Sequence, residues 1–447
     1  MSTPQAADGR PESDVSSTVG LVGLVGLFVW LLVCRNWAGI GEALNLPGPR
    51  APLSGPNAAL LSVFVAAVPM VLWSIFHDKV HLRASTGIDW KNPRPLRSII
   101  DISITKLAGL WATWALIGFF YCVCRWYWKD SFLFAMHVIA TFAVPMFILS
   151  VPYVLWLDRR LNNPRDGAWH FGAMLIGREA YELDEVWHHL RAWAVKGFFT
   201  AFMVSILPGG FQIMTTINFR DALASPASAT GTLNGLFFFI DVQIGTVGYL
   251  LTLKPFDAQI RSANPYLAGW VAALLCYPPF VMMGMGNILT YQTNTAEWDV
   301  WMQGHPALMW IWGTWLVTLT AIYAWATFAF GIRFSNLTYR GVVTNGPYKY
   351  TRHPAYLAKN TYWWCSTLPF LVTSGSVVDM VRNVTFICVT NAIYYWRART
   401  EEKHLLAEDP KYRAYYEWMA EHGPITRALR RLTGLLRPSG PRLQPAE

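Results

Sequence analysis

Two short polar segments toward the C-terminal end hold the residues that could do chemistry. The first is NGPYKYTRHPAYLAKN (345–360), in which Arg352 and His353 come directly before Pro354. Proline disfavours helix at the residue before it and suits the first position of a helix, so a helix should begin near Pro354. The free N–H groups of a helix start favour a carboxylate or another anionic group, and Arg352 and His353 would lie beside them.

The second polar segment is NAIYYWRARTEEKHLLAEDPKYRAYYEW (391–418). Arg397 and Glu401 are four residues apart and share one helix face, while Glu402 points about 100° away. The segment between them, 360–398, predicts two apolar helices joined by the turn SGSVVD (374–379). Because such a hairpin returns the chain to its starting side, the two polar segments should meet. We expect a pocket lined by aromatic, basic and acidic side chains, suited to a ligand with both cationic and anionic groups.

The elements that must position this pocket are membrane helices. Of the 447 residues, 53% are hydrophobic and only 14% are charged, whereas soluble domains carry roughly 25% charged residues. A helix needs about 20 apolar residues to cross a bilayer. Such segments are predicted near 19–36, 57–77, 99–124, 131–157, 196–217, 233–253, 265–289, 306–330, 360–377 and 379–398. The sequence therefore predicts an all-α polytopic membrane protein with about ten transmembrane helices, of which the last two form the hairpin.

The positions of the basic residues predict the orientation in the membrane, because Lys and Arg collect in cytoplasmic loops. The loops 77–97, 158–196 and 331–359 and the C-terminal tail are basic, whereas the loop 291–307 has two acids and neither Lys nor Arg. With ten spans, all the basic segments fall on one side and the acidic loop on the other. Both termini and the pocket should be cytoplasmic, in the inner membrane if the cell is bacterial.

The charge and the cysteines exclude several other classes of function. The net charge of +9 lies in short loops between apolar spans, so anionic lipid head groups are the expected partner and nucleic acid is not. The six cysteines form no CxxC pair. His77 and His81 lie one helical turn apart but have no further ligands nearby in the sequence, so no metal site is predicted. No obligate protein partner is evident.

Together, the two polar segments resemble the C-terminal signature of the isoprenylcysteine carboxyl methyltransferase family. That signature reads roughly G-x-Y-x-x-x-R-H-P-x-Y, a helical hairpin, R-x-R-x-E-E-x-x-L and Y-x-x-Y. It is matched here by Gly346, Tyr348, Arg352, His353, Pro354, Tyr356, Arg397, Arg399, Glu401, Glu402, Leu405, Tyr412 and Tyr415. The resemblance covers about residues 306–425. It departs from the family pattern at Ala358, where a glycine is common, and at Lys359-Asn360, which place polar groups at the start of a span.

The resemblance implies an S-adenosylmethionine site in the hairpin and its cytoplasmic flanks. The cofactor would be lined by Tyr348, Arg352, His353, Pro354, Tyr356 and Glu402. Arg399 and Glu401 would lie nearer the methyl acceptor and take the catalytic roles. A lipophilic, membrane-associated carboxylate is the expected acceptor, because it is already ionised and needs positioning rather than a base. An amine or thiol acceptor would need a base, for which Glu401 and His404 are the candidates.

Two other functions remain open at this stage. NADPH-dependent sterol-type reductases also have about ten spans and similar C-terminal motifs, but they prefer Asn before the motif tyrosine, where this chain has Ala355, and Asp-Glu in place of Glu401-Glu402. A transporter or lipid-binding protein could use the spans before the hairpin, where Asp241 is the charge best placed to line a cavity.

The predicted organisation has four parts. Residues 1–18 form a disordered tail, and 19–300 form a transmembrane bundle of unknown role. Residues 301–425 form the cofactor-binding region, and 426–447 form an amphipathic segment and tail.

Overall fold

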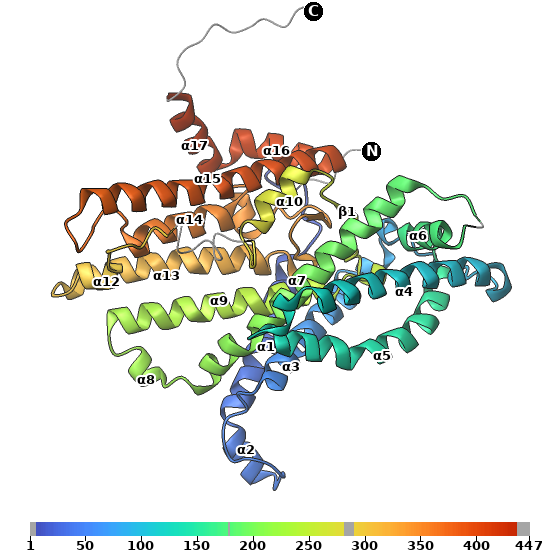
Figure 1. Ribbon diagram of the computed structural model, residues 1–447, viewed down its shortest axis with the longest axis horizontal. Helices are drawn as coiled ribbons and strands as arrows, with labels where there is room; N and C mark the ends of the chain where they lie inside the picture. The colour runs from blue at the N-terminus through green and yellow to red at the C-terminus, as the bar shows by residue number, and fades with distance from the viewer. Residues whose placement is uncertain (1–5, 178, 281–289, 436–447) are drawn as a thin grey trace, which may run out of the picture.

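The computed structural model describes residues 6–177, 179–280 and 290–435, and this part of the chain is mostly helical (Figure 1). Its one sheet pairs β1 (Ser262–Ala263) with β2 (Thr338–Tyr339), antiparallel, with Ser262 opposite Tyr339. The chain is thus an α protein in which a short ladder ties two loops together.

Seven of the predicted spans are helices long and apolar enough to cross a membrane. They are α1 (Ser17–Arg35), α3 (Pro56–Leu72), α4 (Ile100–Val123), α5 (Phe132–Asp158), α7 (Leu183–Thr216), α9 (Pro226–Leu250) and α13 (Pro306–Phe328). A π-helical turn, η1 (Trp73–His77), extends α3. The outer faces of these helices are apolar: on α5, Val144, Ile148 and Leu149 are each more than 60% exposed. Exposed apolar faces of this kind fit a lipid environment.

The other three predicted spans are not among these seven, although α15 (Val377–Glu408) covers the last of them, 379–398. In 265–289, α10 (Leu267–Leu274) has only eight residues, and residues 281–289 lie outside the described part. The hairpin is confirmed as α14 (Pro354–Thr367) followed by α15 (Val377–Glu408). However, α14 is 14 residues long, about 21 Å at 1.5 Å per residue, which is shorter than a bilayer core. It ends at Thr367 because Leu368 precedes a proline and adopts a left-handed conformation. The described residues therefore hold seven helices of spanning length and composition, fewer than the ten predicted.

The remaining elements are short or follow the hairpin. The α-helices among them are α2 (Trp37–Ala43), α6 (Gly167–Ile176), α8 (Phe219–Ala222), α12 (Trp298–Trp301), α16 (Pro410–His422) and α17 (Pro424–Leu435). The 3-10 turns are η2 (Val80–Leu82), η3 (Ala84–Thr86), η4 (Leu96–Ser98), η5 (Arg125–Trp128), η6 (Lys254–Phe256), η7 (Gly331–Arg333) and η8 (Gly346–Lys349). The amphipathic helix predicted at the C-terminal end is present as α17 up to Leu435, and residues 436–447 lie outside the described part.

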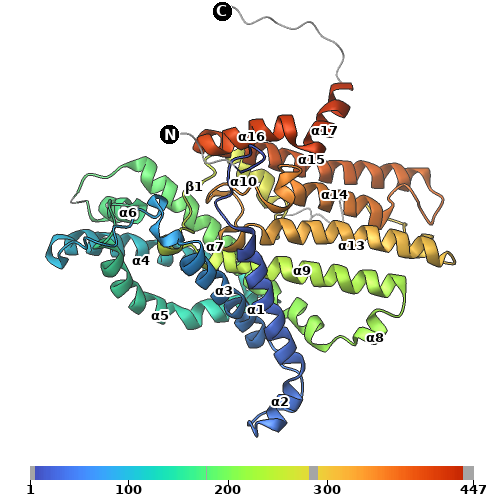
Figure 2. The same ribbon diagram turned by 180° about the vertical axis from the view of Figure 1, so that it is seen from behind.

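The helices form two groups that meet at α1, α3 and α7 (Figures 1 and 2). In one group, α9, α13, α14 and α15 lie side by side, each packed on the next. In the other, α4 packs on α5 and α6. The crossing of α4 and α6 is close because glycine faces glycine: a Cβ on Gly109 would overlap the Ala168 carbonyl, and one on Gly172 would overlap the Thr105 carbonyl. The first group holds both polar segments.

The N-terminal residues 6–16 are not the disordered tail predicted for 1–18. They cross the loop after α13 and reach α16, and we call them the N-terminal strap (Figure 2). Asp14 explains the difference, because its carboxylate accepts hydrogen bonds from Val342 N at 2.7 Å and Lys411 Nζ at 2.6 Å. The Trp418 indole N–H donates to the Asp8 carbonyl at 3.2 Å. The strap and α16 therefore lie at the same end of the molecule. Which side of a membrane this end faces stays a prediction.

Candidate functional site

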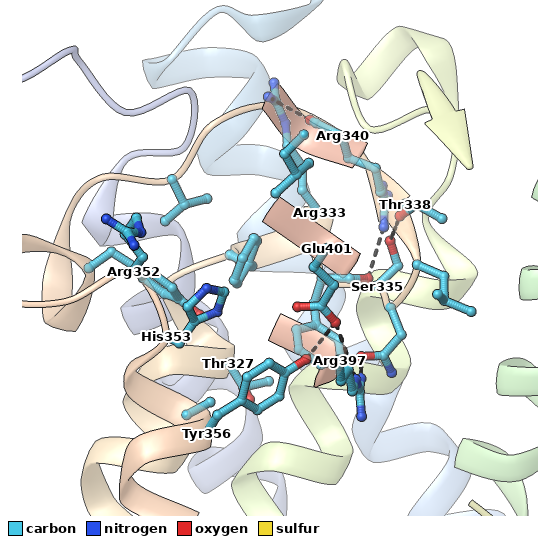
Figure 3. A pocket seen from close by; sticks show the side chains of 18 of the residues that line it. Thr327, Arg333, Ser335, Thr338, Arg340, Arg352, His353, Tyr356, Arg397 and Glu401 are labelled. Carbon is cyan, nitrogen blue, oxygen red and sulfur yellow. Dashed lines mark hydrogen bonds and ion pairs between the residues drawn. The ribbon is translucent and has the colours of Figure 1, made fainter. Parts of the chain in front are cut away.

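A cavity of about 190 Å³ lies where α13, α14 and α15 meet the loop after α13 (Figure 3). Helical periodicity explains its walls, because residues three or four apart share a face. The helices line it with Tyr323 and Thr327 of α13, Tyr356 and Lys359 of α14, and Tyr394, Arg397 and Glu401 of α15. The two polar segments predicted to meet thus share one cavity.

Tyrosine rings make up much of the cavity wall. They come from α13 to α16 and from two loops: Tyr277, Tyr323, Tyr348, Tyr356, Tyr394, Tyr412 and Tyr415. The Tyr415 hydroxyl donates to the Tyr348 carbonyl at 2.8 Å, which fixes α16 against η8. Because the face of an aromatic ring attracts cations, this wall suits a positively charged group of a ligand.

Glu402 joins the hairpin's first helix to its second. Its Oε1 lies 2.7 Å from Arg352 Nε and 3.0 Å from His353 Nε2. Its Oε2 accepts from Arg399 Nη1 at 2.7 Å. Burial acts to raise the pKa of Glu402, but the hydrogen bonds and charges of His353 and Arg352 outweigh it and lower the pKa to about 2. Glu402 is therefore ionised at neutral pH and fixes the start of α14 against α15.

Glu401 anchors a second cluster, on the cavity side of α15 (Figure 3). Its Oε1 accepts from the Tyr356 hydroxyl at 2.5 Å and from Arg397 Nε at 3.2 Å. Arg397 Nη2 donates to Asn336 Oδ1 at 2.6 Å. The Arg397 guanidinium also lies over the rings of Tyr356 and Tyr277, at 5.2 and 5.5 Å from their centres. Burial raises the pKa of Tyr356, so its hydroxyl stays protonated and donates to Glu401.

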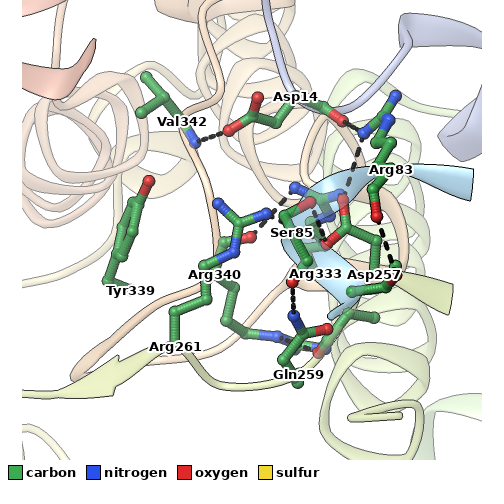
Figure 4. A network of polar contacts seen from close by, with 12 residues as sticks. Asp14, Arg83, Ser85, Asp257, Gln259, Arg261, Arg333, Tyr339, Arg340 and Val342 are labelled. Atoms are coloured by element: carbon green, nitrogen blue, oxygen red, sulfur yellow. Dashed lines mark hydrogen bonds and ion pairs between the residues drawn. The ribbon is translucent and has the colours of Figure 1, made fainter. Parts of the chain in front are cut away.

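A network of arginines shapes the loop that closes the cavity (Figure 4). The Arg340 guanidinium is buried and donates to the carbonyls of Gly248, Leu251, Ala258, Ile332 and Phe334. Arg333 donates to Asp257 Oδ2 at 2.6 Å and to the Arg340 carbonyl at 3.1 Å. Since guanidinium groups satisfy several carbonyls at once, they hold the loop after α13 on α9 and on the loop that follows α9. The cavity therefore depends on parts of the chain far from the hairpin.

The structure brings most of the predicted site residues to this cavity. Tyr348, Arg352, His353, Tyr356 and Glu401 line it. Pro354 begins α14 at the position the sequence indicated, and Glu402 lies behind Arg352 and His353. Arg399 does not line the cavity. Its side chain is 55% exposed on the outer face of α15, where it pairs with Glu402.

The cavity also contains residues that the sequence did not assign to the site. Arg397 takes the wall position on α15, and its spacing to Glu401 was the available signal. Lys359 was noted only as a departure from the family pattern, yet it lines the cavity. Tyr277 and Asn336 gave no local signal, because tertiary contacts alone bring them there.

The hairpin lies in a region of the chain that matches a known protein family. Residues 308–407 match the isoprenylcysteine carboxyl methyltransferase (ICMT) family. This ICMT-family region runs from α13 through the hairpin into α15, so the resemblance in the C-terminal third is confirmed. No curated protein and no solved structure shows significant similarity to the chain. Three elements that line or support the cavity lie outside the ICMT-family region: the N-terminal strap, α9 and α16.

Proposed function

We propose that the protein is an integral membrane methyltransferase that uses S-adenosylmethionine to methylate a lipophilic acceptor, above all a carboxylate. One observation carries the proposal: the motif residues Tyr348, Arg352, His353 and Tyr356 of the ICMT-family region line one cavity. The long apolar helices support a membrane location. An active site on the cytoplasmic side, of the inner membrane in a bacterium, is part of the proposal.

The chemistry of the cavity fits the cofactor. S-adenosylmethionine has a cationic sulfonium, an amino acid end with both charges and an aromatic base. The tyrosine wall suits the sulfonium and the base. Arg352 and His353, which Glu402 fixes from behind, offer hydrogen-bond donors and the charge of Arg352 at the start of α14 for the carboxylate of the amino acid end. Tyr348, Arg352, His353 and Tyr356 are therefore the residues that would hold it, and Glu402 would keep Arg352 and His353 in place from behind.

The chain itself would contribute positioning rather than a base. When bound, S-adenosylmethionine supplies a methyl group on a sulfonium, which an ionised carboxylate can attack while the methyl–sulfur bond breaks. The products are a methyl ester and the neutral thioether S-adenosylhomocysteine, and no proton moves. Arg397 is held by Glu401 and Asn336, so it provides a fixed positive charge on the wall. The surrounding aromatic rings limit the access of water.

Binding by the detergent-purified protein tests the proposal. Calorimetry with S-adenosylmethionine, S-adenosylhomocysteine and NADPH should give micromolar binding of the first two only. His353→Ala should weaken that binding at least tenfold. Glu408→Gln, on the same helix but outside the cavity lining, should leave it unchanged.

Each other outcome contradicts the proposal. Binding of NADPH alone would identify a sterol-type reductase. Binding of none of the three by folded protein would leave a transporter or lipid-binding protein in which the hairpin is structural.

A further inference from the structure

Lys359 lines the same cavity further along α14 than Arg352 and His353, which we call the rim residues. It is six residues after His353, which is about 9 Å along α14 at 1.5 Å per residue. Its ammonium lies 5.4 Å from the ring centre of Tyr323, 5.3 Å from Trp363 and 5.6 Å from Tyr394. These rings surround it from three helices, α13, α14 and α15. Cation–π contacts hold an ammonium without using its N–H donors.

Those donors have no acceptor in the described part of the chain, although Asp241 is near enough for its charge to act on Lys359 and Glu401 lines the same cavity. Glu401 Oε1 already receives hydrogen bonds from Tyr356 and Arg397. Asp241 lies behind the wall, where one oxygen receives the Tyr323 hydroxyl at 2.9 Å and the other receives the Thr327 hydroxyl. Lys359 is half-buried and lines the cavity, so its ammonium N–H groups remain available to a ligand that enters there. At the position of Lys359 the free hydrogen-bonding groups are therefore the donors of a cation, and an anionic oxygen would pair with them.

We propose that Lys359 binds the anionic head group of the methyl acceptor and so determines which acceptors enter. This inference rests on the proposed function. The rim residues would hold the cofactor, and Lys359, one to two helical turns further along α14, would hold the group that receives the methyl. A carboxylate there gains hydrogen bonds from the ammonium, whereas a protonated amine is repelled by it.

The proposal also gives part of the N-terminal bundle a role. Asp241 belongs to α9, outside the ICMT-family region, and its charge acts on Lys359 across the ring of Tyr323. Among the described residues Asp241 accepts from Tyr323 and Thr327 and not from Lys359, so the carboxylate balances the charge of Lys359 without taking up its donors. The N-terminal bundle would therefore keep the ammonium available to the acceptor.

Soluble probes of matched shape test this inference. Octanoate and octylamine are titrated by calorimetry into protein saturated with S-adenosylhomocysteine. The wild type should bind octanoate at least tenfold more tightly than octylamine. Lys359→Met should lose that preference while its affinity for S-adenosylhomocysteine stays unchanged, and Lys359→Arg should keep most of the preference. Lys349→Met, an exposed lysine outside the cavity lining, is the matched control and should behave as wild type.

The outcomes separate the two proposals. Equal binding of the two probes by the wild type, or an unchanged preference in Lys359→Met, would overturn the role of Lys359 and make it a packed cation only. If the Met variant does not fold, Lys359→Gln takes its place and is judged in the same way. Failure of the wild type to bind S-adenosylhomocysteine would instead remove the proposed function itself.

Discussion

Replacing Glu402 by Gln changes one buried carboxylate and little of its shape. The amide keeps an oxygen that can accept a hydrogen bond, but the charge that pairs with Arg352 and His353 is lost. Arg352 would keep its place over the Tyr416 ring, 4.0 Å from the ring centre, without its anionic partner. Removing one partner of a buried ion pair is more costly than the pair's own net contribution, because the other charge stays behind.

The structure gives the magnitude of this change. Lowering the pKa of Glu402 from its ordinary 4.5 to about 2 corresponds to about 3 kcal/mol, since each tenfold change in proton affinity is about 1.4 kcal/mol. The pair with the half-exposed Arg399 adds little, within about 1 kcal/mol. We therefore expect Glu402→Gln to lower the free energy of unfolding by about 2–3 kcal/mol.

The effect should depend on pH with a definite sign. The pKa of Glu402 is lower in the folded protein than in the unfolded chain, so its stabilisation is complete above about pH 4.5. It is lost as the pH falls from about 4.5 to about 2. Thermal unfolding in detergent, followed by tryptophan fluorescence at several pH values, measures this. Wild type and Glu402→Gln should differ at pH 7 and converge toward pH 2.

Glu408→Gln is the matched control on the same helix. Glu408 is exposed and lies 3.7 Å from His404. Burial lowers the pKa of that histidine to about 4, so His404 is neutral at pH 7 and the two residues form no ion pair there. This variant should unfold within about 0.5 kcal/mol of wild type. The reasoning is refuted if the two variants unfold alike at pH 7, or if the difference for Glu402→Gln does not change with pH.

Three further changes test other parts of the fold. Asp14→Asn should release the N-terminal strap at a cost of about 1.5 kcal/mol and so speed protease cleavage within residues 6–16. Glu12→Gln, at an exposed position of the strap, should not speed cleavage, and equal cleavage of the two variants would contradict the strap contacts. Gly172→Ala should lower thermal stability by about 1–3 kcal/mol through overlap with α4, whereas Gly118→Ala, with open space around it, should be neutral or stabilising by up to about 1 kcal/mol. Arg340→Lys should lower the free energy of unfolding by at least about 3 kcal/mol, because one ammonium cannot reach all the carbonyls that the guanidinium satisfies. A variant as stable as wild type in thermal unfolding would show that other contacts hold the loop after α13.

Local sequence signals predicted the site better than they predicted the fold. Pro354 indicated the start of α14, and the spacing of Arg397 and Glu401 indicated their shared face; both are present in the structure. These features depend on neighbours along the chain, which a sequence displays directly. Composition likewise indicated the seven long apolar helices.

Features that depend on distant partners were not predictable in the same way. Residues 6–16 are polar and read as disordered, but Asp14 finds Val342 and Lys411 more than 300 positions away. Hydrophobicity across 360–377 predicted a full span, whereas the helix stops before Pro369. Tyr277 and Asn336 reach the cavity through tertiary contacts alone.

Hydrogen–deuterium exchange with and without saturating S-adenosylhomocysteine tests the central claim most directly, because it locates the ligand as well as detecting it. The account predicts slower exchange in residues 345–359 and 394–416, around the cavity, and no change in α4 or α6. Protection confined to α4 and α6, or none at a saturating concentration of the ligand, would contradict it.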